Sequence, residues 1–364
     1  MRLLHIADVH LERPYKGLGL GRGNARRQEL RDALAGVVEL AREKRVDALC
    51  IAGDLFEREN TRPAIGQFLQ SQFASLDRIQ VLIAPGNHDY FSPGCLYDRS
   101  DWTDNVQIFR EQCLTSVQIA DGTVWGTAFT GPERRISPLA GFLAAGTGTA
   151  VGLFHAALVG PGLTSPYGPL DPAEIIRSGL AFVMLGHIHA GQLDHNRRFA
   201  YPGSLEPLDV SEAGPRWALL LDVSEGGLSV DTIEVARRRV ITEDLDVTAL
   251  VTHQALADAV AARRDGWLGN DVSLRVVGTL QGELAANPAL IRDELSDLAA
   301  RLEIAAEPFP DVDDLAHQQS TLGLFVRRAR EKIAGATGEA EQRRWQAALR
   351  AGIAAFKEQE EFLP

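Results

Sequence analysis

The sequence contains little cysteine, because Cys50, Cys95 and Cys113 are the only three among 364 residues. An odd number of cysteines without the short spacing of metal-binding pairs excludes a disulfide framework and a cysteine-ligated zinc site. We therefore expect three reduced thiols that carry no function.

Long apolar runs are missing as well. No stretch approaches the roughly 20 apolar residues that a membrane helix requires, and residues 1–6 are too short for the core of a signal peptide. We expect a cytoplasmic protein without a membrane partner.

Positive charge is scarce, since 37 Lys and Arg residues stand against 49 Asp and Glu residues and give a net charge of -12. Such a molecule repels nucleic acid at long range, so a polyanionic partner must be met by a local basic patch or by metal ions. The densest basic stretch contains Arg13, Lys16, Arg22, Arg26, Arg27 and Arg31. It is either a solvated loop that leads into a helix from Arg26 onward, or a surface that contacts phosphate groups.

The sequence does contain five apolar runs that end in polar residues able to bind metal. Residues 79–84 stop at Pro85 and Gly86, and the other runs end in the same manner; the polar residues that follow the five runs are Asp8 and His10, Asp54, Asn87, His88 and Asp89, His155, and His187 and His189. Apolar runs of this length bounded by Pro or Gly predict buried strands. We expect these strands to bring their terminal side chains to one edge.

Asp, Asn and His side chains together suit divalent metals that accept oxygen and imidazole ligands. Seven of them are more than one ion needs: Asp8, His10, Asp54, Asn87, His155, His187 and His189. If one carboxylate bridges, they divide into two sets, as in sites that hold two metals about 3.5–4 Å apart. Singly, a histidine that follows a strand is more often a core residue, so the prediction rests on the joint pattern.

The order Asp8-x-His10, Gly53-Asp54, Gly86-Asn87-His88-Asp89, His155 and Gly186-His187-x-His189 resembles the signature of the calcineurin-like metallophosphoesterases. Within that superfamily, residues 5–11, 53–56 and 201–204 are similar to the Mre11/SbcD DNA-repair nucleases, and residues 14–18 to a bacterial YhaO-type branch. The resemblance extends to about residue 235. It implies an α/β fold, a two-sheet α/β/β/α sandwich with the site at the upper edge of the sheets.

The resemblance also implies a role for each site residue. Asp8, His10, Asp54 and His189 would bind one metal, and Asp54, Asn87, His155 and His187 the other. The two ions would be Mn²⁺, with Fe²⁺, Zn²⁺ and Mg²⁺ as alternatives. His88 would stabilise or protonate the leaving oxygen while Asp89 orients its imidazole ring. Glu57 stands where archaeal nucleases of the family carry a histidine.

The chain is expected to have three parts. Alternating strands and helices predict an α/β core at 1–236, followed at 237–306 by a small α/β unit with a helix from Pro288 whose apolar face reaches Leu302. Residues 307–364 are expected to form a linker at 307–314 and a helical hairpin, with the apolar stripes Leu322, Phe325, Val326, Ala329, Ile333 and Trp345, Leu349, Gly352, Ile353, Phe356.

The hairpin has two interpretations. Its stripes can pack on each other or on the core, or they can bind a partner. In Mre11-like proteins a helical segment in this region grips the coiled-coil base of an SMC-like, Rad50-like ATPase, so the resemblance implies such a partner and a homodimer of the chain. Phe325 and Trp345 are the expected anchors, because large aromatic residues dominate interface energetics.

Three functions fit these observations. The first is a metal-dependent DNA nuclease, an exonuclease of DNA repair, with phosphate contacts from Arg13, Lys16, Arg22, Arg26 and Arg27. The second is a phosphoesterase for small phosphodiesters or phosphomonoesters, which the acidic net charge favours but the basic stretch does not explain. The third is a largely structural partner subunit of the ATPase, which the complete set of metal ligands disfavours.

Overall fold

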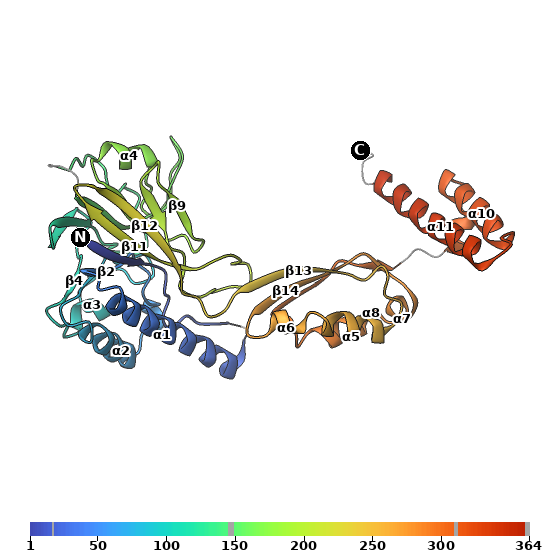
Figure 1. Cartoon of the computed structure of the whole chain (residues 1–364), viewed down its shortest axis with the longest axis horizontal. Helices are drawn as coiled ribbons and strands as arrows, with labels where there is room; N and C mark the ends of the chain where they lie inside the picture. The colour runs from blue at the N-terminus through green and yellow to red at the C-terminus, as the bar shows by residue number, and fades with distance from the viewer. Residues whose placement is uncertain (17, 145–148, 309–311, 361–364) are drawn as a thin grey trace. The chain divides into compact units, whose positions relative to one another are not determined.

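The computed structural model describes residues 1–16, 18–144, 149–308 and 312–360. It contains two compact units, Met1–Thr242 with Trp267–Ser273, and Glu243–Gly266 with Leu274–Pro364 (Figure 1). The division into three parts at residues 236 and 306 stays a prediction.

The first sheet of the first unit has the strand order β12-β11-β1-β2-β3-β4. Its strands are β1 (Arg2–Ile6), β2 (Ala48–Ile51), β3 (Gln80–Ile83), β4 (Val106–Ile108), β11 (Trp217–Ser224) and β12 (Gly227–Glu234). Strands β1 to β4 are parallel, whereas β11 is antiparallel to β1 and β12 to β11. Strands β2 and β3 are buried on both faces, which explains why their sequences are nearly continuous apolar runs.

Two long helices cover the outer face of this sheet. They are α1 (Gly19–Glu43) and α2 (Pro63–Ala74), with the short elements η1 (Arg58–Asn60) and α3 (Leu96–Arg99) nearby in the chain. Leu34 of α1 and Leu69 of α2 belong to one hydrophobic cluster with Leu4 of β1. Helix α1 begins at Gly19, earlier than the predicted start at Arg26. Arg26 lies inside the helix, where it is buried and forms an ion pair with Glu29.

The second sheet has the order β5-β6-β7-β8-β10-β9. Its strands are β5 (Thr115–Ile119), β6 (Gly122–Gly126), β7 (Ala150–His155), β8 (Phe182–Gly186), β9 (Gln192–Asp194) and β10 (Phe199–Tyr201). Strands β6, β7, β8 and β10 are parallel, and the edge strands β5 and β9 are antiparallel to their neighbours. Helix α4 (Pro172–Arg177) begins with the expected capping box of Asp171 and Glu174.

A shared hydrophobic cluster lies between the two sheets. Leu3 and Leu82 of the first sheet pack in it with Leu153 and Met184 of the second. The outer face of the second sheet has its own cluster, to which α4 contributes Ile175. Helices therefore lie outside two facing sheets, and the predicted α/β/β/α sandwich is confirmed.

The two sheets lie in close contact at the ends of β2 and β8. A Cβ atom added at Gly186 would overlap the carbonyl oxygen of Ala52 and lie 2.9 Å from the Cβ of Ala7. Only glycine fits at this position, because any side chain would push the strand ends apart. The glycine before His187 thus brings the ligands of the two sheets within reach of one another.

After β12 the chain forms a smaller α/β arrangement, most of which belongs to the second unit. Strands β13 (Val240–Asp246), β14 (Asp271–Val277) and β16 (Arg301–Ile304) form one sheet, and β15 (Thr279–Leu280) pairs with β17 (Glu307–Pro308). The accompanying helices are α5 (His253–Ala261), α6 (Arg264–Trp267), α7 (Gly282–Ala286) and α8 (Pro288–Leu295). The expected helix to Leu302 is wrong beyond Leu295, because residues 301–304 pair with β14 as a strand.

The C-terminal part contains α9 (Val312–His317), α10 (Thr321–Ala334) and α11 (Glu339–Glu360). Helices α10 and α11 form the predicted hairpin, in which Val326, Leu349 and Ile353 are buried in one cluster. The predicted linker at 307–314 is only partly irregular, since Glu307–Pro308 is a strand and α9 begins at Val312, while 309–311 lie outside the described residues. None of the helices in the described ranges is long and apolar enough to cross a membrane.

Candidate metal centre

The strand ends gather the predicted ligands at one edge of the sandwich. Asp8 and His10 follow β1, Asp54 follows β2 and Asn87 follows β3; His155 ends β7, and His187 and His189 follow β8. The carboxyl ends of neighbouring parallel strands meet at the same sheet edge. Within the described ranges, Asp8, His10 and His189 form one group of close ligand atoms, and Asp8, Asp54 and His155 form another.

Several ligands have backbone conformations that side chains rarely adopt. Asp8, His10 and Asp54 have φ values of 51°, 49° and 51°, and His187 has a φ of 105°. Positive φ in residues other than glycine is strained and persists only where the surroundings enforce it. The Asp8 amide donates to the Gly53 carbonyl at 3.1 Å and the His10 amide to the Asp54 carbonyl at 2.9 Å, so the two strand ends hold each other in this geometry.

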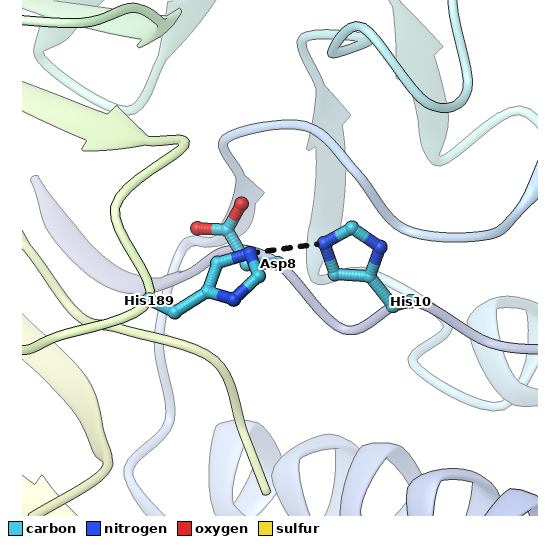
Figure 2. Close-up of side chains that lie close together, drawn as sticks. All are labelled: Asp8, His10 and His189. Carbon is cyan, nitrogen blue, oxygen red and sulfur yellow. Dashed lines mark hydrogen bonds between the residues drawn. The ribbon is translucent and has the colours of Figure 1, made fainter. Parts of the chain in front are cut away.

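The first ligand set centres on two histidines that face each other (Figure 2). The Nε2 atoms of His10 and His189 lie 3.2 Å apart. The Nδ1 atom of His10 is 2.9 Å from Glu57 Oε1, and that of His189 is 2.7 Å from Glu212 Oε1. A carboxylate only accepts, so each Nδ1 carries a proton, and in the neutral rings two Nε2 lone pairs then point at the same place.

That arrangement fits a shared cation. Two imidazole nitrogens, each about 2.0–2.1 Å from one ion, lie about 3 Å apart at the angles that four- to six-coordinate metals adopt. The Asp8 carboxylate lies beside the two rings (Figure 2) and is fully buried. Burial raises the pKa of Asp8, because it disfavours the charged carboxylate. A divalent ion would supply the positive charge that stabilises this carboxylate.

The second set adjoins the first through Asp54. One oxygen of Asp54, Oδ2, lies 3.6 Å from His10 Nε2 and 3.4 Å from His155 Nε2. His155 Nε2 is 2.9 Å from Asn87 Oδ1, and its Nδ1 donates to the Ala52 carbonyl at 2.9 Å. The ring of His187 packs edge-on against that of His155, with centroids 5.2 Å apart. Asp54 therefore has the position that a bridging carboxylate requires.

The electrostatics of Asp54 agree with this position. Burial raises the pKa of its carboxyl group, but the nearby side chains of His155, His10 and His88 and a hydrogen bond from the His88 amide together outweigh burial, so the pKa lies below its ordinary value. Gly86 is constrained by the same carboxylate, because an added Cβ would overlap Asp54 Oδ1. The ligand set of carboxylate, amide and imidazole groups fits two divalent ions of the manganese, iron or zinc type.

His88 is more accessible than the ligands, with a side chain that is 42% exposed. Its Nδ1 lies 2.8 Å from Glu57 Oε2, and this hydrogen bond raises the pKa of His88 to about 9. Burial raises the pKa of Glu57, but its hydrogen bonds with His10 and His88 outweigh burial and lower the pKa well below its usual range. His88 thus presents Nε2 at an accessible position beside the candidate metal ligands.

The expected role of Asp89 is wrong. Its carboxylate accepts from the backbone amides of Asp54, Leu55 and Gly86 at 3.1, 2.7 and 2.6 Å, and from the Tyr97 hydroxyl at 2.6 Å. Asp89 is 1% exposed and burial raises its pKa to about 6. It ties the ends of β2 and β3 together, and Glu57 holds His88 instead.

Two carboxylates of the site are absent from the predicted set of site residues. In the sequence, Glu57 stands out only as a difference from archaeal relatives. Its position three residues after Asp54 is the one signal that could have placed it in the site. Glu212 lies in the segment between β10 and β11, and no local pattern marks it as the partner of His189.

The basic stretch lies next to this site, but its members differ in accessibility. Arg13 Nη1 is 3.8 Å from Glu57 Oε1, and Arg27 lines an open pocket together with Pro14 and Arg62. Lys16 and Arg22 are exposed. Arg26 was a predicted DNA contact, but it is buried against Glu29, Asp271 and the Pro207 carbonyl, so its guanidinium group is not accessible to DNA.

Comparison with known proteins identifies the family. Residues 1–191 match the model of the calcineurin-like phosphoesterase family, so this chain belongs to that family. It is accordingly an enzyme that hydrolyses phosphate esters, and its family uses divalent metals.

Relatives include both uncharacterized and nuclease members. The uncharacterized metallophosphoesterase YhaO of Bacillus subtilis is 26% identical over 330 residues, which are 85% of this chain and 79% of the relative. The DNA double-strand break repair protein Mre11 of Aeropyrum pernix is 31% identical over 272 residues, 68% of this chain and 64% of the relative. The SbcD subunit of the nuclease SbcCD of Rhodobacter capsulatus is 27% identical over 279 residues, 62% of this chain and 67% of the relative.

Replacement of the shared carboxylate tests the ligand assignment. Asp54→Asn keeps the shape but removes the charge between the two sets, so we expect loss of at least one metal equivalent and of hydrolysis. Elemental analysis of the purified protein measures this, with Asp231→Asn on exposed strand β12 as the matched control. Two full equivalents in Asp54→Asn would refute the bridging position.

Proposed function

We propose that this chain is a metal-dependent DNA nuclease that hydrolyses phosphodiester bonds, with Mn²⁺ as its metal. The observation that supports this most is the pair of histidines facing at 3.2 Å, beside the buried Asp54 and the accessible His88. The nuclease relatives Mre11 and SbcD support the choice of DNA as substrate. Exonuclease activity in DNA repair is the finer form of this proposal.

In the proposed mechanism the chain's residues bind, orient and supply a proton. Bound divalent ions would activate water and neutralise charge on the phosphate oxygens. Asp8, His10, Asp54 and His189 would hold one ion, with Asn87, His155 and His187 beside Asp54 for the other. His88, held at Nδ1 by Glu57, would give its Nε2 proton to the departing sugar oxygen.

The accessible basic residues would hold the DNA backbone near the site. Arg13, Lys16, Arg22 and Arg27 lie on the segment that begins beside Glu57 and continues into α1. Because the net charge of the chain is -12, this local patch must offset long-range repulsion. The same net charge favours the second candidate, a phosphoesterase for small phosphodiesters or phosphomonoesters, which would not need the patch.

We also propose that the α10/α11 hairpin docks an SMC-like, Rad50-like ATPase, with two copies of the chain in the assembly. The relative SbcD is by its name one subunit of the nuclease SbcCD, which supports a partner. Phe325 is half-buried against Gly352 and contacts Phe356, so it also stabilises the hairpin itself. Leu324, which is 48% exposed, lines a surface groove with Arg328 and Trp345, and these residues are the better anchors.

Loss of the proton donor should separate turnover from metal binding. His88→Ala should retain both metals, because His88 is not a proposed ligand, and lower the rate of DNA cleavage by roughly 100- to 10,000-fold. The measurement is Mn²⁺-dependent cleavage of labelled single- and double-stranded DNA, with His195→Ala in an exposed turn as control. A parent rate in His88→Ala would contradict the assignment.

Neutralising the accessible basic patch should distinguish DNA from small substrates. Lys16→Ala, Arg22→Ala and Arg27→Ala combined should weaken DNA binding and reduce its log-log salt slope by up to about 3. Hydrolysis of bis(p-nitrophenyl) phosphate should stay close to the parent rate. The combined Arg78→Ala, Arg99→Ala and Arg177→Ala variant removes the same charge from other exposed positions and serves as control. Equal losses on both substrates would favour the small-substrate function or misfolding.

A charge placed in the hairpin groove should prevent docking. Leu324→Glu should abolish co-purification with the SMC-like ATPase of the same organism, because it puts a carboxylate into an apolar contact, while metal content stays unchanged. Ala340→Glu on exposed α11 surface is the control. Unchanged ATPase binding by Leu324→Glu would place the docking surface elsewhere.

A further inference from the structure

Glu57 contacts two imidazole rings that have different functions. Its Oε1 lies 2.9 Å from His10 Nδ1 and its Oε2 lies 2.8 Å from His88 Nδ1, so each carboxylate oxygen takes one ring. The rings of His10 and His88 are nearly perpendicular, at 78°, with centroids 4.8 Å apart. The side chain of Glu57 is 13% exposed, so water competes little for these oxygens.

The backbone around Glu57 is tied to the segments that carry both histidines. The Glu57 amide donates to the Leu11 carbonyl at 2.9 Å, next to His10 in the chain. The following amide, of Arg58, donates to the carbonyl of His88 itself at 3.2 Å. Glu57 and Arg58, which follow β2, therefore hold the rings of His10 and His88 and the backbone next to each ring.

The acceptor chemistry of a carboxylate is what this arrangement needs. Both Nδ1 atoms must donate if His10 is to present Nε2 to the ligand set and His88 is to present Nε2 to the substrate. A carboxylate accepts at both oxygens. A carboxamide of the same shape accepts at one atom and donates at the other, so one of the two rings would lose its acceptor and its orientation.

We propose that Glu57 is a positioning residue that fixes the metal ligand His10 and the proton donor His88 together. Its effect on His88 rests on the proposed function, whereas its effect on metal binding through His10 does not. Glu57 links metal binding to proton donation, because any displacement of its carboxylate alters both the ligand His10 and the donor His88.

The first arm of the test measures metal binding without turnover. Glu57→Ala, which removes the acceptor of both rings, should bind Mn²⁺ about 10- to 100-fold more weakly in calorimetric titration, the loss typical when the acceptor of a ligating histidine is removed. Glu225→Ala, in the exposed turn between β11 and β12, should bind Mn²⁺ like the parent. Parent affinity in Glu57→Ala would overturn the His10 half of the proposal.

The second arm compares leaving groups at saturating Mn²⁺. Thymidylyl-thymidine loses a sugar oxygen that needs a proton, whereas bis(p-nitrophenyl) phosphate loses a nitrophenolate that needs little help. Glu57→Ala should therefore lower kcat at least about tenfold more on the dinucleotide than on the nitrophenyl ester. In the His88→Ala background the same substitution should lower kcat on the dinucleotide less than about threefold, because its target is gone.

Three outcomes separate the possibilities. Equal losses on both substrates, additive with His88→Ala, would mean that Glu57 supports the fold in general and would overturn the proposal. Loss of a full metal equivalent at saturating Mn²⁺ would make Glu57 a direct ligand and also overturn it. A parent enzyme that hydrolyses the nitrophenyl ester but neither the dinucleotide nor DNA would refute the nuclease function, and the calorimetric arm would still decide the His10 half.

Discussion

The geometry of the centre depends on oxygen acceptors that hold four of its histidines by Nδ1. Glu57 holds His10 and His88, Glu212 holds His189, and the Ala52 carbonyl holds His155. With Nδ1 occupied, every one of these rings has only Nε2 left for a ligand or substrate. The remaining features of the site, the close sheets and the strained strand ends, place these rings at the distance where their free nitrogens converge.

The fold and the ligands could be predicted because their signals are local. Each run predicted as a buried strand is followed directly by a candidate ligand, so the sequence predicts that Asp54, Asn87 and His155 come together, and the structure places them side by side. The C-terminal hairpin was equally visible in its two apolar stripes. The helix expected to reach Leu302 failed, since pairing of residues 301–304 with β14 overrides the apolar spacing.

The partners of the ligands could not be predicted in the same way. Glu212 contacts His189 although the two residues are distant in the sequence. The sheet topology that brings them together has no local signal in the sequence. Asp89 follows His88 directly, so proximity in sequence suggested contact, but the tight turn directs its carboxylate to three backbone amides and Tyr97. Positive φ values at Asp8, His10 and Asp54 are likewise held by tertiary hydrogen bonds, because Asp and His adopt this conformation more often than most residues but still only in a minority of cases.

The buried carboxylate of Asp89 has a consequence for the life of the enzyme in a cell. The ends of β2 and β3 are joined by this carboxylate and by main-chain hydrogen bonds, which are contacts that need no ion. We therefore expect this part of the scaffold to keep its shape when ions are scarce, unlike small zinc domains that unfold without metal. Activity could then return on the timescale of ion binding and not of new synthesis.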